Sequence, residues 1–239
     1  MHILTRPQRV YVVCAAVFLT ALVIAEATAG KFFTAFDLPV AVRILGVEFP
    51  SVVMTAGVIA FPVTFIVTDV MNEYFGKAGI RFVTFVGLAM VVFAFGLLQV
   101  ALAVPTAPNS PVPDAAFAAV FGTTSRVIVA SLIAYLVGQL VDISLFHWLR
   151  RLTDGRHLWL RATGSTLGSQ FLDTFVVLAV AFAGQLALGE IVAITLFNYG
   201  YKVVIAVAIT PLVYAAHAAI DRYLGHDLAE ALERTAEAG

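Results

Sequence analysis

Long runs of apolar residues dominate the chain, and six of them are long enough to cross a lipid bilayer as helices. We place them near residues 10–30, 51–70, 81–104, 124–148, 162–188 and 191–220. A helix needs about 20 apolar residues to span a hydrocarbon core of about 30 Å. The runs are apolar on all sides, whereas the strands of a membrane β-barrel alternate apolar and polar residues. The pattern predicts an all-α integral membrane protein with six transmembrane helices.

Composition supports this class. Of the 239 residues, 61% are hydrophobic and only 12% are charged, whereas a soluble domain carries about 25% charged residues. The net charge of −1 argues against a nucleic acid partner, and the single cysteine, Cys14, excludes an intrachain disulfide or a thiol metal cluster. We expect one membrane domain over residues 1–220 and a short cytoplasmic C-terminal tail over 221–239, which the spacing of its leucines predicts to form a surface helix.

Two polar segments interrupt the apolar runs. Around Asp37-Leu38-Pro39, aromatic and β-branched residues flank a turn-forming tripeptide, which predicts a small interfacial hairpin. The proline-rich segment 105–122 is expected to be a loop with a short helix at 114–120. The first apolar run and the following Ala27-Thr28-Ala29 resemble a signal peptide, but the run is long for one, so we interpret it as the first transmembrane helix.

The basic residues outside the apolar runs are distributed unevenly. Ten fall on one side of the predicted bilayer: Arg6, Arg9, Lys77, Arg81, Arg150, Arg151, Arg156, Arg161, Arg222 and Arg234. The other side has Lys31, Arg43 and Arg126. Because basic residues concentrate on the cytoplasmic side, both termini are predicted to lie in the cytoplasm. This topology puts Asp142 in the cytoplasmic half, Asp173 near mid-depth and Glu26 toward the exterior. Glu26 is either an interfacial carboxylate or part of a site.

One short pattern occurs twice within the apolar runs. The first copy is Gly138-Gln139-Leu140-Val141-Asp142 and the second is Ser169-Gln170-Phe171-Leu172-Asp173. Residues three apart share a helix face, so each copy presents an amide and a carboxylate together. A carboxylate at a membrane helix centre costs about 2.5–3.5 kcal/mol even on the lenient insertion scale. We interpret the two pairs as one site for a polar, planar solute. The alternative is that they hydrogen-bond across a helix interface.

Further polar residues lie within the apolar runs. Asp69, Asn72 and Glu73 are close together on one helix face, just before Gly76, which is a natural helix stop. They are either site residues or a solvated helix end. Lys202 lies inside the last run, where it would extend toward the interface, pair with an aspartate or contact the solute.

The fifth run begins with small residues at a spacing of four. These are Gly164 and Gly168, and Ser165 and Ser169. Such pairs allow two helix backbones to approach closely. We therefore expect the fifth helix to pack on the fourth, with both amide and carboxylate pairs in one cavity between them.

Three motifs together resemble the queuosine precursor transporter family, also called the vitamin uptake transporter family. The segment from Phe61 to Lys77, Phe-Pro-Val-Thr-Phe-Ile-Val-Thr-Asp-Val-Met-Asn-Glu-Tyr-Phe-Gly-Lys, is similar to the family signature. The two Gln/Asp motifs resemble its other marked motifs, and Asn198-Tyr199-Gly200-Tyr201-Lys202 fits its last helix. The resemblance covers roughly residues 10–220.

The resemblance implies a multi-pass carrier of the bacterial inner membrane that imports 7-deazaguanines, such as preQ0, preQ1 or queuine, for tRNA modification. In such a ligand, a carboxylate can accept the N1–H and NH2 groups, while Gln, Asn or Lys can donate to O6. Phe171 or Tyr199 could stack on the ring. The candidate substrate-binding residues are Asp69, Asn72, Glu73, Gln139, Asp142, Gln170, Phe171, Asp173, Asn198, Tyr199 and Lys202.

Two other classes of function were weighed against this one. The first is a substrate-binding membrane subunit of an ATP-energised importer; the chain itself contains no Walker-type phosphate loop. The second is an intramembrane enzyme, which lacks support because neither a His-Glu-x-x-His nor a Gly-x-Ser-x-Gly motif is present. We expect no cofactor and no metal. The expected partners are a 7-deazaguanine, the lipid bilayer and a second copy in a homodimer.

Overall fold

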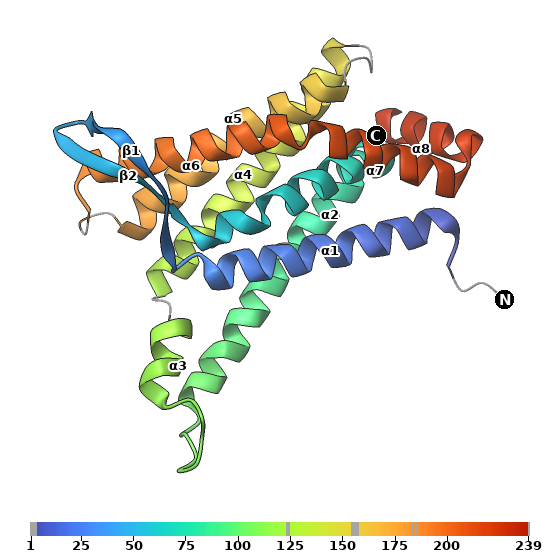
Figure 1. The fold of residues 1–239 in the computed structure, drawn as a ribbon. Coiled ribbons are helices and arrows are strands. Elements are labelled where there is room, and N and C mark those ends of the chain that lie inside the picture. Colours follow the sequence, from blue (N-terminus) through green and yellow to red (C-terminus); the bar gives the residue numbers. More distant parts are fainter. Residues whose placement is uncertain (1–3, 123–124, 154–157, 183, 185, 239) are drawn as a thin grey trace.

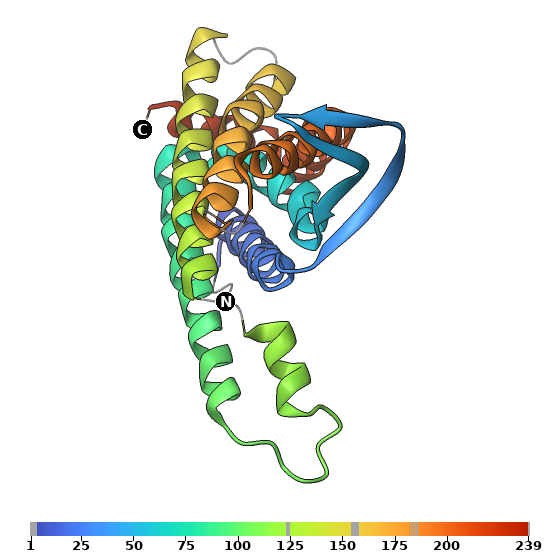
Figure 2. The same ribbon diagram turned by 90° about the vertical axis from the view of Figure 1, so that its left-hand side faces the viewer.

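The computed structural model describes residues 4–122, 125–153, 158–182, 184 and 186–238. In chain order the elements are α1 (Arg6–Thr28), β1 (Phe32–Ile44), β2 (Val47–Thr55), a 3₁₀ helix η1 (Ala56–Ala60), α2 (Phe61–Ala103), α3 (Asp114–Phe121), α4 (Ser125–Leu152), α5 (Leu158–Phe182), α6 (Leu188–Ala208), α7 (Thr210–Leu224) and α8 (His226–Ala238) (Figure 1). Figure 2 shows α4 and α5 side by side, with part of α2 along α4 and the β-hairpin along α6.

By length and composition, four helical stretches in the described part of the chain could each cross a membrane. They are Arg6–Thr28, Ala56–Ala103, Val129–Leu152 and Leu188–Ala208. A shorter apolar helix covers Leu167–Val180. Large apolar side chains are exposed on the outer faces of these helices, as expected where lipid replaces water. The chain is therefore a mainly α-helical, multi-pass membrane protein.

Helix α2 consists of two limbs, 61–75 and 77–103, which meet at a kink (Figure 1). Gly76 makes the kink with φ 62° and ψ −171°, a conformation that favours glycine. The expected helix stop at Gly76 is thus confirmed, and the limbs correspond to the second and third predicted spans. The predicted start of the second span at residue 51 is wrong, because residues 51–55 pair with β1 in a sheet and the helix begins at Phe61.

The predicted hairpin is confirmed, but its predicted turn is wrong. Strands β1 and β2 are antiparallel and turn at Leu45 and Gly46, both with positive φ, as a two-residue hairpin loop requires. Asp37 lies instead at an irregularity of the pairing, which extends from there to Val42 and contains Pro39.

The last predicted span, 191–220, is two helices rather than one. Helix α6 ends at Ala208, and α7 begins at Thr210 with Pro211 in its first turn. Proline lacks the N–H that would continue the first helix and is well tolerated at the start of the next. The short helix predicted at 114–120 is confirmed as α3.

Helices α4 and α5 pack closely, as the small residues of α5 predicted. The two helices run antiparallel. A Cβ atom added to Gly138 would lie 2.8 Å from the Asp173 Cβ, and one added to Gly164 would lie 2.8 Å from a Leu149 methyl. A Cβ added to Gly168 would lie 2.5 Å from a Leu145 methyl. The two leucine methyl groups could move aside for a Cβ, but the Asp173 Cβ is fixed to the α5 backbone. Gly138 is therefore the position at which the close approach of the two helices favours glycine.

The chain termini and the kink of α2 lie at one end of the molecule, which we call the basic end (Figure 1). There the Arg6 Nη1 donates to the Leu224 carbonyl at 3.4 Å. A Cβ added to Gly76 would lie 2.9 Å from the Ala236 backbone of α8. Arg150 and Lys77 belong to the same end. The side chains of Arg126, Arg156 and Arg161, which entered the predicted topology, lie outside the described residues.

Candidate functional site

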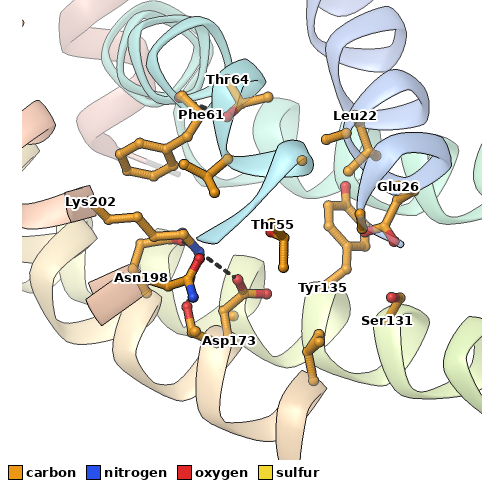
Figure 3. A pocket seen from close by; sticks show the side chains of 18 of the residues that line it. Leu22, Glu26, Thr55, Phe61, Thr64, Ser131, Tyr135, Asp173, Asn198 and Lys202 are labelled. Atoms are coloured by element: carbon orange, nitrogen blue, oxygen red, sulfur yellow. Dashed lines mark hydrogen bonds and ion pairs between the residues drawn. The ribbon is translucent and has the colours of Figure 1, made fainter. Parts of the chain in front are cut away.

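A cavity of about 190 Å³, which we call the main cavity, lies between α1, the start of α2, α4, α5 and α6 (Figure 3). Its lining includes a set of polar side chains within a mostly apolar bundle: Glu26, Thr55, Thr64, Ser131, Tyr135, Gln139, Gln170, Asp173, Thr174, Asn198 and Lys202. The predicted residues Gln139, Gln170, Asp173, Asn198 and Lys202 are thereby brought together.

Lys202 is the centre of the polar contacts in the main cavity. Its Nζ donates to Gln170 Oε1 at 2.6 Å, to Thr174 Oγ1 at 3.0 Å and to Asp173 Oδ2 at 3.1 Å (Figure 3). The Lys202 side chain is only 13% exposed, so it does not extend toward the interface. The interpretation that Lys202 pairs with an aspartate is confirmed.

Helical spacing brings these groups together. Gln170, Asp173 and Thr174 are three and four residues apart and therefore share one face of α5. Asn198 lies four residues before Lys202 on α6 and donates its amide to the Ile194 carbonyl at 2.8 Å. The Asn198 oxygen and the Lys202 ammonium are thus on the helix face that borders the main cavity.

A second carboxylate, Glu26 of α1, lies on the opposite side of the main cavity (Figure 3). It points toward Ser131 of α4, and Tyr135 stands beside them. The Tyr135 hydroxyl donates to the Thr84 carbonyl at 3.1 Å. The sequence left open whether Glu26 belongs to an interface or to a site, because its depth at a helix end was the only signal. The structure places it in the lining of the cavity.

A second, smaller cavity of about 40 Å³, the small cavity, lies next to the main one. It is lined by Phe61, Thr64, Phe65, Thr68, Asp69, Asn72, Gln139, Asp142, Phe146, Ser165 and Gln170. Phe61, Thr64, Gln139 and Gln170 line both cavities. The lining residues from α2, at positions 61, 64, 65, 68, 69 and 72, recur at helical spacings of three and four, so one face of the signature segment forms one wall.

The two Gln/Asp pairs do not share a single cavity, contrary to the expectation. Asp142 is buried and lines the small cavity, where its Oδ1 accepts a hydrogen bond from Ser169 Oγ at 3.1 Å. Asp173 lines only the main cavity. The two helices are antiparallel and offset along their axes, so the two carboxylates lie at different heights. Both glutamines lie at the boundary between the main and the small cavity.

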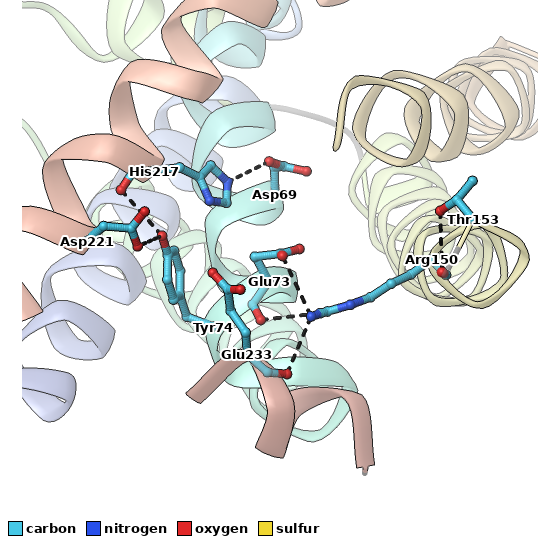
Figure 4. A network of polar contacts seen from close by, with 8 residues as sticks. All are labelled: Asp69, Glu73, Tyr74, Arg150, Thr153, His217, Asp221 and Glu233. Atoms are coloured by element: carbon cyan, nitrogen blue, oxygen red, sulfur yellow. Dashed lines mark hydrogen bonds and ion pairs between the residues drawn. The ribbon is translucent and has the colours of Figure 1, made fainter. Parts of the chain in front are cut away.

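A polar network connects the signature segment to the basic end (Figure 4). The His217 Nε2 lies 3.0 Å from the Asp69 Oδ2. The Tyr74 hydroxyl donates to Asp221 Oδ1 at 2.6 Å, and its ring stacks on His217 with centroids 5.3 Å apart. These contacts fix the first limb of α2 against α7 and hold Asp69 at the wall of the small cavity.

Glu73 is directed away from both cavities. Its carboxylate lies 3.6 Å from Arg150 Nη2, and the side chains are 6% and 5% exposed. The Arg150 guanidinium also donates to the carbonyls of Glu73 and Glu233, at 3.3 and 3.4 Å. This arrangement joins α2, α4 and α8 (Figure 4). Glu73 therefore connects helices and, unlike Asp69 and Asn72, does not line the small cavity.

The two aromatic residues predicted to stack on the ligand, Phe171 and Tyr199, lie outside the linings of both cavities. Phe171 and Tyr199 form an edge-to-face pair with centroids 5.4 Å apart, and Phe171 is 39% exposed. Neither ring is in the lining of the two cavities. Phe61 lines both, and the Lys202 Nζ lies 5.6 Å from its ring centroid. Phe61 lies eight residues before Asp69 on the same helix. This spacing puts both on one helix face and could have identified Phe61 as a site residue.

Comparison with known proteins gave consistent matches. The profile of a family described as "Putative vitamin uptake transporter" matches residues 55–216. The "Probable queuosine precursor transporter" of Bacillus subtilis is 32% identical over 171 residues, which cover 71% of this chain and 74% of that protein. The "Queuosine precursor transporter" of Escherichia coli is 29% identical over 156 residues, or 64% and 67% of the two chains.

A third relative has the same description. The "Probable queuosine precursor transporter" of Haemophilus influenzae is 30% identical over 128 residues, which cover 54% of this chain and 52% of that protein. No solved structure matches the chain.

Proposed function

The chain belongs to the vitamin uptake transporter family, and we propose that it imports queuosine precursors, 7-deazaguanines such as preQ0 or preQ1, across the bacterial inner membrane. Relatives that match along much of their length are named queuosine precursor transporters. The observation that carries the proposal is the main cavity, in which the Lys202, Asp173 and Gln170 side chains meet inside an apolar bundle. Queuine is a further candidate substrate. The imported base would serve tRNA modification.

The chemistry of the main cavity suits a small base with both donors and acceptors. Asp173 Oδ2 accepts a hydrogen bond from Lys202 Nζ at 3.1 Å. A 7-deazaguanine could insert beside this pair, with its N1–H and NH2 groups donating to the carboxylate and its O6 accepting from the ammonium. The second carboxylate, Glu26, would meet the opposite edge of the ligand. Phe61 offers a ring face within reach of the same ammonium.

The size of the main cavity agrees with a ligand of this kind. Its volume of about 190 Å³ lies below the roughly 300–1,000 Å³ of sites for drug-sized ligands. A fused pair of rings without a sugar is the ligand class that we propose. A nucleoside would have to displace lining side chains.

We propose six membrane crossings made by α1, the two limbs of α2, α4, α5, and α6 with α7. The basic end would then face the cytoplasm, because basic residues concentrate there. Helix α8 would lie on the cytoplasmic side as the short tail after the membrane domain. A homodimer stays a prediction, which the mass of the purified protein in detergent would test.

Uptake by the protein alone tests the proposed function. The purified protein, inserted in sealed vesicles without any other subunit or ATP, should accumulate labelled preQ0 or preQ1 above the level of protein-free vesicles. Uptake that appears only when a separate ATP-hydrolysing subunit is added would instead support the alternative, a substrate-binding subunit of an energised importer. Uptake that is absent under both conditions would contradict both.

A further inference from the structure

The small cavity is lined by residues with buried polar atoms that have no hydrogen-bond partner in the described part of the chain. Asn72 is 0% exposed, and neither atom of its side-chain amide has a hydrogen-bond partner among the described residues. The same holds for Asp69 Oδ1 and Gln139 Nε2. All three residues line the small cavity. Because an unmet buried polar atom is costly, the arrangement indicates that something polar occupies this space.

The charged residues around the small cavity indicate the sign of the charge that a bound ligand would carry. Two carboxylates, Asp69 and Asp142, line it. Asp142 accepts a hydrogen bond from the Ser169 hydroxyl, and Asp69 contacts the His217 ring through Oδ2. The Lys202 ammonium belongs to the main cavity. A buried carboxylate is stabilised by a nearby positive charge or by neutralisation. The His217 ring can supply that charge only at Asp69 Oδ2, so a cation beside Asp69 Oδ1 and Asp142 would stabilise both carboxylates.

The lining of the small cavity supplies several oxygen atoms that could bind a cation. Asp69 and Asn72 each have one oxygen without a partner among the residues described. The hydroxyls of Thr64 and Thr68 donate their hydrogens to the carbonyls of Phe61 and Thr64, at 2.9 and 2.7 Å, so their lone pairs remain available. Together with Asp142, these oxygens can surround a hard cation. The amide N–H groups of Asn72 and Gln139, which also lack a partner among the described residues, would be satisfied by a water molecule bound beside the ion.

Size and ligand type restrict the cation further. A cavity of about 40 Å³ can hold a bare ion or a water molecule but not a fused-ring base. In the described part of the chain no group of three or more His, Cys, Asp or Glu could hold a metal ion. Few carboxylates combined with neutral amide and hydroxyl oxygens suit a singly charged ion better than a divalent one.

We propose that the small cavity binds Na⁺ and that this ion is coupled to transport through the main cavity. The coupling follows from Gln139 and Gln170, which line both cavities. An ion that draws the Gln139 amide or Asp69 toward itself changes the wall that the solute meets. The coupling rests on the proposed transport function, whereas the ion site itself does not.

Thermal unfolding of the purified full-length protein tests the ion site directly. NaCl should raise the unfolding temperature relative to choline chloride at equal ionic strength, because a ligand that binds only the folded state stabilises it. In Asn72→Leu, which keeps the branched shape of the side chain but replaces its polar atoms with larger methyl groups, the Na⁺ concentration for half of this effect should rise by at least about tenfold. Equal unfolding temperatures in both salts would overturn the proposal.

Two threonines provide a matched pair of variants. Thr68 and Thr195 are both buried, and each donates its hydroxyl to a helix carbonyl at 2.7 Å. Only Thr68 lines the small cavity. Thr68→Val should weaken the Na⁺ effect by about three- to tenfold, and Thr195→Val should leave it unchanged. Equal responses of the two variants would contradict an ion site at this wall.

Transport in vesicles separates the ion site from the function. Uptake of preQ1 should be faster with an inward Na⁺ gradient than with choline, and Asn72→Leu should remove the difference. Uptake that is equal in both salts, or that depends only on a pH gradient, would overturn the coupling while the proposed function stands. If preQ1 is not taken up in either salt, the proposed function fails, and the unfolding experiment still decides the ion site.

Discussion

Gly138 of α4 lies directly against Asp173 of α5, at a distance where an added Cβ would be 2.8 Å from the Asp173 Cβ and 3.2 Å from its Oδ1. The relationship has a counterpart, because Ser169 of α5 donates to Asp142 of α4 at 3.1 Å. In each copy of the repeated pattern, the small first residue therefore receives the aspartate of the other copy. The repetition in the sequence thus corresponds to a reciprocal contact between two antiparallel helices.

This contact makes Gly138→Ala a sharp perturbation. The new methyl group would push Asp173 away from Lys202 or force α4 and α5 apart, at a cost of about 1–3 kcal/mol for overpacking. We expect reduced preQ1 uptake and a lower unfolding temperature. Gly200→Ala is the matched control, because a Cβ there would have no neighbour within 4 Å. Uptake that falls equally in both variants would contradict the account.

The Lys202–Asp173 ion pair should be visible in a double-mutant cycle. Lys202→Met leaves the carboxylate without its partner, and we expect a loss of about 1.5–3 kcal/mol in the free energy of unfolding, as for hydrogen bonds to charged groups. Adding Asp173→Asn should recover part of this loss, since the uncompensated charge is then gone. Chemical unfolding in detergent measures all four proteins. Strictly additive effects would show that the pair has no coupling energy.

Glu26 should contribute to binding, although its place near a helix end did not decide between an interface and a site. Glu26→Gln replaces an acceptor with a mixed donor and acceptor in the main cavity, and we expect the affinity for preQ1 to fall by about tenfold. Glu48→Gln, on the exposed surface of the hairpin, provides the control. Equilibrium binding to the purified protein is the measurement. Unchanged affinity in Glu26→Gln would restrict the site to α5 and α6.

The proposed orientation can be checked with single cysteines in a protein that lacks Cys14. Ser110→Cys lies in the loop between α2 and α3, and Arg234→Cys lies on the exposed face of α8. A membrane-impermeant maleimide added to intact spheroplasts should label position 110 at once. Position 234 should react only after permeabilisation. The reverse result would invert the topology.

Several features could be predicted because a local rule decides them. The apolar runs give the helices, Gly76 ends the first limb of α2, and the small residues of α5 allow close packing on α4. The pairing of Lys202 with an aspartate could also be predicted, because an ammonium group inside a membrane protein is stabilised by a nearby carboxylate.

Other features depend on which segments meet in space. The hairpin turn is at Gly46 rather than at Pro39 because the strands pair along nearly their full length. The height offset between α4 and α5 sends Asp142 and Asp173 to different cavities. Glu73 lies outside the linings of both cavities because its carboxylate is directed toward Arg150, which is 77 residues further along the chain. None of these distances is contained in a local pattern.

The central claim is that the carboxylate of Asp173 receives the donor edge of a 7-deazaguanine in the main cavity. Asp173→Asn keeps the shape of the side chain but turns an amide NH2 toward one of the ligand's donors. The loss should be about 1.5–3 kcal/mol, or roughly ten- to hundredfold in affinity. Lys202 keeps its hydrogen bonds to Gln170 and Thr174 in this variant, so the amount of protein in the membrane should stay near wild type.

Titration calorimetry of preQ1 into the purified protein tests this claim most directly. Wild type and Asp37→Asn, a control on the exposed face of β1, should bind preQ1 with the same Kd. Asp173→Asn should bind it at least about tenfold more weakly. If all three proteins bind preQ1 equally well, Asp173 only holds Lys202 in place, and the main cavity is not the site of recognition.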